Sequence, residues 1–182
     1  MDNSETTTTF TPVEAVANFF IEKGIDNKNP LTQLQIQKLV FISHGWYLGI
    51  YNKNLIDEDF EAWQFGPVVR ELYEHLKVYK NNKVTSKISK EEAEFDDGVI
   101  KKYTTTPVVK GEKIVSHLEI IWDTHGGLSG AQLVNITHQK NSPWYAVYVE
   151  MNRYKGRISN NLIQQYYKEL SVNLSEQKQQ TK

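Results

Sequence analysis

The sequence predicts a mainly α protein, a single compact multi-helix domain with a minor β element. Apolar residues recur at helical spacing in several long stretches, helix-start motifs precede most of them, and alternating strand patterns are few and short. A chain of 182 residues is long enough to bury one core without disulfides. We expect the β element to be a short hairpin or edge strands around residues 60–65 and 99–109.

Capping motifs mark the starts of several predicted helices. Thr32 and Ser129 each stand three residues before a glutamine, and Ser142 stands directly before a proline. A hydroxyl at the N-cap with Gln or Glu three residues later, or a proline at the first helical position, is typical of a helix start. Thr11 and Glu14 have the same spacing, so the first helix is predicted to begin there.

The remaining elements are predicted from apolar periodicity and from breaks in it. The helix after Thr32 has apolar residues around most of its circumference, which indicates a central, buried helix. Gly66 and Pro67 break an extended stretch, and Pro67 suits the first position of a third helix. A fourth helix is predicted over 112–125 and a last helix from Ser159.

Composition along the chain suggests three parts. Residues 1–10 are expected to be a disordered N-terminal tail, 11–170 a helical domain, and 171–182 a polar C-terminal tail. Within the domain, 80–112 is rich in Lys, Asn, Thr and Glu and is expected to be a variable insertion, with only a short helix at 89–92.

Composition also narrows the functional classes. The formal net charge of −1 provides no general attraction to nucleic acid, so we expect no nucleic-acid partner, and the absence of cysteine excludes disulfides and thiolate nucleophiles. The start of the chain lacks the pattern of a signal peptide, and no apolar stretch reaches the roughly 20 residues needed to span a bilayer. We therefore expect a cytoplasmic protein with no membrane partner.

Motifs for catalysis and cofactor binding are absent from the sequence. The five histidines, at positions 44, 75, 117, 125 and 138, do not have the spacing of metal ligands, so we predict no metal and no cofactor. No Gly-x-Ser-x-Gly motif occurs, and Ser129 is better explained as a helix cap than as a nucleophile. His44 and His138 stay open, each as a hydrogen-bonded structural histidine or as a site residue.

Four ordered stretches resemble the signatures of one family, the Panacea antitoxin domain of SocA-like bacterial and phage proteins. These stretches are Leu34-Gln35-Ile36-Gln37-Lys38-Leu39-Val40-Phe41 with Gly45-Trp46-Tyr47; Phe60-Glu61-Ala62-Trp63-Gln64-Phe65-Gly66-Pro67-Val68-Val69; Leu128-Ser129 through Leu133 with Thr137-His138-Gln139 and Ser142-Pro143-Trp144; and Ile163 to Tyr167. Their order and spacing agree over about residues 12–170, and only 80–112 is unmatched. Four matches in order are far more specific than any single motif.

The resemblance implies a helical fold, no cofactor and no enzymatic activity. It implies an antitoxin that neutralises the toxin encoded by a neighbouring gene through direct protein binding. One alternative is a proteolytic adaptor that delivers the toxin to a AAA+ protease, and another is an uncharacterised enzyme that uses His44 or His138. Some members have an added zinc-binding or DNA-binding region, for which this chain has neither cysteines nor a spare segment.

The motifs supply a set of candidate residues for partner binding or for the core of the domain. These are Gln37, Lys38, His44, Trp46, Tyr47, Trp63, Gly66, Pro67, Thr137, His138, Pro143 and Trp144. Trp46, Trp63 and Trp144 are candidates for one shared aromatic centre. Because a family that binds unlike toxins should keep its scaffold and vary its contact surface, partner-specific residues are expected in the loops, including 80–112. The oligomeric state is left open.

Overall fold

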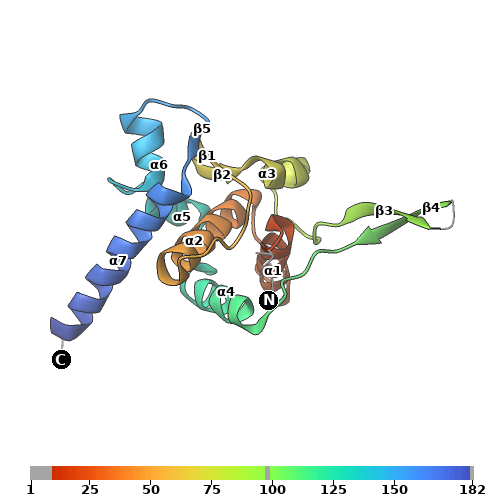
Figure 1. The fold of residues 1–182 in the computed structure, drawn as a ribbon, viewed down its shortest axis with the longest axis horizontal. Coiled ribbons are helices and arrows are strands. Elements are labelled where there is room, and N and C mark those ends of the chain that lie inside the picture. The colour runs from red at the N-terminus through yellow and green to blue at the C-terminus, as the bar shows by residue number, and fades with distance from the viewer. Residues whose placement is uncertain (1–9, 97–98, 181–182) are drawn as a thin grey trace, which may run out of the picture.

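The structure is a computed structural model that describes residues 10–96 and 99–180, and it is mainly helical with a small amount of antiparallel β structure (Figure 1). This confirms the predicted class. The elements in chain order are α1 (Val13–Asp26), α2 (Gln33–Tyr51), β1 (Phe60–Trp63), β2 (Gly66–Val69), α3 (Arg70–Leu76), the 3-10 helix η1 (Lys77–Tyr79), β3 (Lys90–Asp96), β4 (Val99–Thr105), α4 (Glu112–His125), α5 (Gly130–Thr137), α6 (Pro143–Tyr145), the π-helix η2 (Ala146–Glu150), β5 (Gly156–Ile158) and α7 (Asn160–Gln180).

Helix α2 forms the centre of the domain, as its all-round apolar pattern predicted. Its residues Ile36 to Ile42 are almost completely buried, including the polar Gln37 and Lys38. Helices α1, α4, α5 and α7 and strand β2 all contact it. Figure 1 shows α2 in the middle of the molecule, between α7 and α1. Any polar side chain on α2 must therefore find its partners inside the protein.

Three of the predicted helix caps are confirmed. Thr32 and Ser129 each accept a hydrogen bond from the backbone of the glutamine three residues on, and that glutamine bonds back to the cap, so both capping boxes are complete. The Ser142 hydroxyl accepts from the N–H of Tyr145 at 3.1 Å, with Pro143 at the start of the helix. These helix starts depend only on residues within one turn.

The predicted cap at Thr11 is wrong. Helix α1 starts at Val13 with Pro12 at the N-cap position, and the N-cap residue makes no side-chain hydrogen bond. The Thr11 N–H donates instead to the carbonyl oxygen of Leu55 at 3.0 Å. Glu14, expected to complete the capping box, is buried with no measurable exposure and forms ion pairs with residues of other elements. Tertiary contacts therefore replace the local ones.

A three-stranded antiparallel sheet, in the order β2-β1-β5, occupies the place where the third helix was predicted to start. Strands β1 and β2 form a hairpin in which Phe60 pairs with Val69. Pro67, predicted at the start of a helix, lies instead in the edge strand β2, a position where proline is tolerated. Helix α3 starts only at Arg70. Proline suits both conformations, and the pairing with β1 selects the strand.

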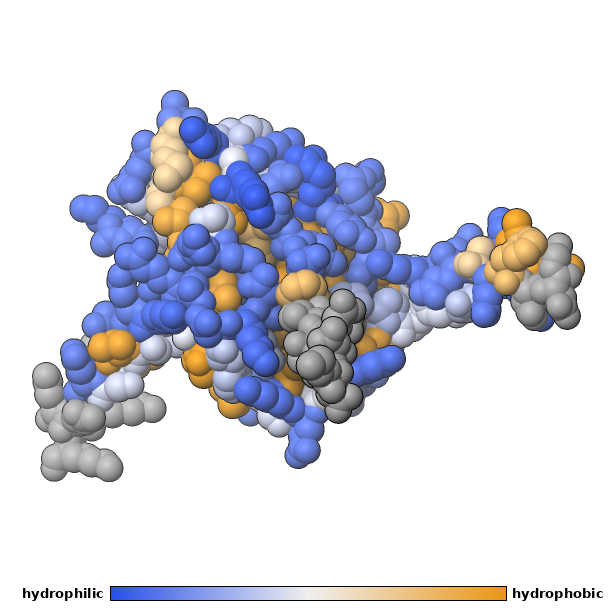
Figure 2. All heavy atoms as spheres, in the orientation of Figure 1, coloured by the Kyte–Doolittle hydropathy of each residue, from blue (hydrophilic) through white to orange (hydrophobic). Residues whose placement is uncertain are grey.

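The predicted variable insertion, 80–112, contains a hairpin arm. Strands β3 and β4 pair from Lys90 with Thr105 to Asp96 with Val99, so the short helix predicted at 89–92 is wrong, whereas extended structure within 99–109 is confirmed. The arm projects from the body of the domain (Figure 1). Figure 2 shows hydrophobic residues gathered near its outer end, where Phe95 and Ile100 are strongly exposed.

The two ends of the chain were predicted to be tails. The N-terminal tail, 1–10, lies outside the described residues except for Phe10. Helix α7 continues from Asn160 to Gln180, so fraying after Leu170 is not observed, although residues 172–176 are exposed. Among the described helices, none is both long enough and apolar enough to cross a bilayer.

Candidate functional site

Gln37 holds the edge strand β2 against the central helix. Its Nε2 donates to the Val69 carbonyl oxygen at 3.1 Å, and its Oε1 accepts from the Val69 N–H at 3.0 Å. The side chain is only 3% exposed, so water does not compete for these bonds. The first and second sequence motifs therefore meet through a paired hydrogen bond between a buried amide and the backbone.

Lys38, the next residue of α2, is completely buried beneath the same hairpin. Its Nζ donates to the Pro67 carbonyl oxygen at 2.8 Å. Burial lowers the pKa of the Lys38 ammonium to about 7, because the charged form loses its hydration. Gly66 leaves room for this side chain, since a Cβ there would lie 2.6 Å from Lys38 Cε. The φ of Gly66 is also +103°, which favours glycine.

His138 and Trp144 bring the third motif to the same place. Their rings stack with centroids 3.5 Å apart, and Trp144 Nε1–H donates to the Trp63 carbonyl oxygen at 2.7 Å. A Cβ on Gly66 would lie 2.9 Å from Lys38 Nζ and 3.1 Å from His138 Nε2, so both nitrogens face the same small space. Burial, and then the nearby Lys38, lower the pKa of His138 to about 4.

We call the residues Gln37, Lys38, Gly66, Pro67, His138 and Trp144 the motif core. A lysine of lowered pKa beside a histidine is chemically able to exchange a proton. The Lys38 side chain, however, has no exposed surface, so it cannot reach a substrate without a rearrangement of the hairpin. The geometry of the motif core therefore favours a structural role over catalysis.

A groove of about 590 Å³ lies beside the motif core. Its walls come from the start of α2, the hairpin β1–β2, helix α3 and the segment before β5. Gln37 of the motif core lines the groove, and so does Trp63, whose carbonyl oxygen accepts a hydrogen bond from Trp144 of the motif core. Phe65 at the hairpin turn is 63% exposed and Tyr154 is 60% exposed. The groove therefore presents large aromatic side chains to solvent.

Trp63 is held in a defined position in this groove. Its ring packs against Tyr73 with centroids 4.9 Å apart, and its Nε1–H donates to Glu61 at 2.8 Å. The Arg70 guanidinium, which is itself paired with Glu61, and the Lys155 ammonium lie 5.6 and 4.6 Å from the ring centroid. Such contacts restrict the orientation of the ring, which makes this part of the groove preorganised.

Comparison with known proteins agrees with the sequence motifs. The family model described as antitoxin SocA-like, Panacea domain, matches residues 36–145, which contain the whole motif core. The chain belongs to this family. The antitoxin SocA of Caulobacter vibrioides (strain NA1000 / CB15N) is 28% identical over 130 residues, 71% of this chain and 66% of that protein, slightly less than two thirds of its length. No solved structure matches the chain.

Other predicted residues of this Panacea domain also serve packing. His44 is fully buried, with Nε2 3.1 Å from Asn160 Oδ1, and burial lowers its pKa to about 4. The Trp46 ring packs on Tyr167, and the Tyr47 ring packs on His117. The expected joint centre of three tryptophans is therefore wrong in the described chain, because each of the three rings packs on other aromatic residues.

Thr137 and Pro143 shape the turn between α5 and α6 that presents His138. The Thr137 carbonyl oxygen accepts a hydrogen bond from the Ser142 hydroxyl at 2.9 Å, and the same hydroxyl caps α6. Both Thr137 and Pro143 are buried. The third motif is thus a rigid corner that sets the stacking of His138 on Trp144.

The motifs did not single out the exposed residues of the groove. Phe65 lies within the second motif. An exposed aromatic residue at a hairpin turn is a recognisable feature, but it can be recognised only after the hairpin has been predicted. Tyr73 and Tyr154 lie outside the matched motifs and reach the groove only through the fold.

Membership of an antitoxin family favours a binding protein over an enzyme, in line with an exposed groove and an enclosed motif core.

Proposed function

We propose that this Panacea-domain protein is the antitoxin of a toxin–antitoxin system and that it binds its toxin directly, at the groove beside the motif core. Family membership supports the antitoxin role, and the curated relative is itself named an antitoxin. The toxin is the protein encoded by the neighbouring gene, and the two proteins meet in the cytoplasm.

The exposure of Phe65 is the observation that supports this binding surface. Its side chain is 63% exposed, although Ala62 and Val68 of the same hairpin are buried. Exposed aromatic residues beside a preformed hollow are typical of the few residues that dominate protein interfaces.

The motif core explains how the groove keeps its shape without a partner. Gln37 and Lys38 tie β2 to α2, and Trp144 ties the end of β1 to α6 through the Trp63 carbonyl. A hairpin held at both strands loses little conformational freedom on binding. Under this proposal the motif residues act on the toxin indirectly, by positioning Trp63 and Phe65.

The test is growth rescue in cells that express the neighbouring toxin gene. Wild-type protein should restore growth and form a stoichiometric complex with the toxin. Phe65→Ala should weaken that complex about tenfold or more, measured by titration calorimetry with purified toxin. Ile120→Ala is the matched control, because Ile120 on α4 is also 63% exposed and lies outside the groove.

Each outcome separates a different part of the proposal. Failure of the wild-type protein to restore growth contradicts the antitoxin role. Equal affinity of Phe65→Ala and wild type contradicts the groove as the toxin-binding surface. Loss of the toxin from cells only when a AAA+ protease is present identifies a proteolytic adaptor and contradicts direct neutralisation.

A further inference from the structure

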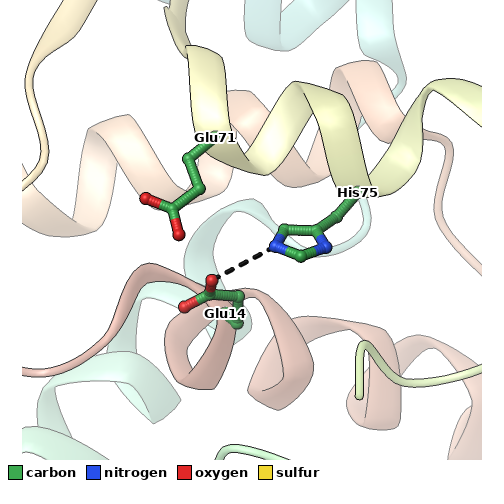
Figure 3. Close-up of side chains that lie close together, drawn as sticks. All are labelled: Glu14, Glu71 and His75. Atoms are coloured by element: carbon green, nitrogen blue, oxygen red, sulfur yellow. Dashed lines mark ion pairs between the residues drawn. The ribbon is translucent and has the colours of Figure 1, made fainter. Parts of the chain in front are cut away.

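A second cluster of ionisable side chains lies where the arm joins the body. Glu14 of α1 faces Glu71 and His75 of α3, and Figure 3 shows the three side chains converging. Each offers one ligand atom, and these atoms lie within 4.8 Å of one another. Glu71 and His75 are four residues apart and so share one face of α3. The three atoms are close enough to bind one metal ion together.

Glu14 is the unusual member of this cluster because its carboxylate is completely buried. Its Oε1 forms ion pairs with Lys90 Nζ and, at 3.3 Å, with His75 Nε2. Its Oε2 is buried and accepts no hydrogen bond from the part of the chain that the structure describes. A buried carboxylate oxygen normally has a donor or a cation beside it, and Oε2 has neither among the described residues.

Glu58 adds a third carboxylate to the same region. Its Oε1 accepts from the Val13 N–H at 3.3 Å, whereas its Oε2 is buried without a hydrogen-bond partner among the described residues. Burial, and then the charges of Glu14 and Glu71, raise the pKa of Glu58. Glu58 thus contributes a second buried carboxylate oxygen without a hydrogen-bond donor among the described residues.

Lys90, the first residue of β3, supplies positive charge to this cluster. Its Nζ pairs with Glu14 Oε1 and lies 3.5 Å from Glu71 Oε1, between the two carboxylates. Among the ion pairs of the described residues, none joins another lysine or arginine to Glu14, Glu58 or Glu71. Glu14 and Glu71 therefore share one ammonium, which leaves excess negative charge for a divalent cation to balance.

We infer that Glu14, Glu71 and His75 form a binding site for a divalent transition-metal ion such as Zn²⁺ or Mn²⁺, with the Lys90 ammonium as a competing cation. Carboxylate oxygens and an imidazole nitrogen are ligands that both ions accept, with water in the remaining positions. His75 and Glu71 are partly exposed, so an ion can enter from solvent. The inference is independent of the proposed toxin binding.

Titration of the full chain with ZnCl₂, after removal of bound metal by a chelator, tests the site by calorimetry. Wild type should bind one Zn²⁺ per chain, and Glu71→Gln should weaken binding by at least about tenfold. Glu74→Gln is the control, because Glu74 lies on the same helix with 53% exposure against 51% for Glu71 and belongs to a different ion pair. Glu71 is exposed enough for its variant to fold.

Removal of the Lys90 ammonium, the competing cation, should raise the affinity for Zn²⁺. Lys90→Gln should bind Zn²⁺ about tenfold more tightly than wild type, which corresponds to about 1.4 kcal/mol. Lys87→Gln, which removes a lysine of similar exposure paired with Glu22, should bind like wild type. Zn²⁺ should also raise the melting temperature of wild type more than that of Glu71→Gln.

Three results would contradict the proposed metal site. One is the absence of Zn²⁺ binding by both wild type and Lys90→Gln. Another is equal loss of affinity in Glu71→Gln and Glu74→Gln, which would indicate only a general effect of surface charge. The third is unchanged affinity in His75→Asn together with Glu71→Gln, which would place the ion at other histidines.

Discussion

Gly66 shows how a single residue can link the three motifs. The side chain of Lys38 and the ring of His138 both approach the position that a Cβ would take on Gly66. Its positive φ and the lack of space for a Cβ are separate reasons for glycine, because one concerns its own backbone and the other its neighbours. From the sequence, Gly66 was predicted to break an extended stretch and, as part of the second motif, was a candidate residue for partner binding or for the core of the domain.

Gly66→Ala should lower the free energy of unfolding by about 2–4 kcal/mol, from backbone strain together with displacement of Lys38. Urea-induced unfolding at neutral pH measures this change. Gly127→Ala is the control, because a Cβ there meets nothing within 4 Å, and its effect should stay within about 0.5 kcal/mol. Similar values for the two variants would show that the space beside Gly66 is not tightly filled.

Lys38 should leave a signature in the pH dependence of stability. Its pKa is about 7 in the folded protein and about 10.4 in the unfolded chain. Between these values the unfolded state binds a proton that the folded state lacks, so the free energy of unfolding rises with pH. Below about pH 7 the folded protein must hold a charged ammonium in its interior, which destabilises it.

Replacement of Lys38 by methionine removes this titration. Wild type should gain up to about 1.4 kcal/mol of stability per pH unit, relative to Lys38→Met, from about pH 7 to about pH 9. Denaturant unfolding across this range measures the difference, with exposed Lys140→Met as the control that should follow wild type. Parallel pH profiles for wild type and Lys38→Met would mean that the ammonium reaches water.

At the scale of elements, the arm is anchored at its base and exposed at its outer end. Asn18 of α1 donates to the Ile88 carbonyl oxygen at 2.9 Å and accepts from the Ile88 N–H at 2.7 Å. Ile88 is buried, whereas Phe95, Val99 and Ile100 are exposed. The outer pairs of β3 and β4 thus add little apolar burial to the domain.

Shortening the arm should therefore leave the domain stable. Deletion of residues 93–102, with a Gly-Gly turn joining the cross-strand partners Glu92 and Tyr103, should change the free energy of unfolding by less than about 1 kcal/mol. Ile88→Ala at the base should cost about 2–4 kcal/mol. Chemical denaturation compares the two, and a larger loss for the shortened arm would show that its outer end packs on the body.

The elements also differ in how well they were predicted. The caps at Thr32, Ser129 and Ser142 use atoms within one helical turn, so the local sequence contains the whole interaction. The pattern at Thr11 is the same, yet Glu14 pairs with Lys90 from the arm instead. Pro67 likewise depends on its pairing with β1. An ion pair or a strand partner far along the chain outweighs a local preference.

At the scale of the whole molecule, α2 forms the centre of the core. The motif core and the candidate metal site are built from side chains of several elements. The motif core collects side chains from α2, β2, the end of α5 and α6. The candidate metal site collects them from α1 and α3, with Lys90 of the arm beside it. No metal was predicted, because the histidines do not have the spacing of metal ligands along the chain and because Glu14 of α1 reaches Glu71 and His75 of α3 only through the fold.

The sequence by itself determined the helical class, the central position of α2, three helix caps and the antitoxin family, since each follows from periodicity, from one-turn interactions or from ordered motifs. Tertiary structure alone decided that Pro67 is in a strand, that 90–105 forms an arm, and that Phe65 and Tyr154 border one groove. Those features need partners distant in sequence, and only folding brings such partners together.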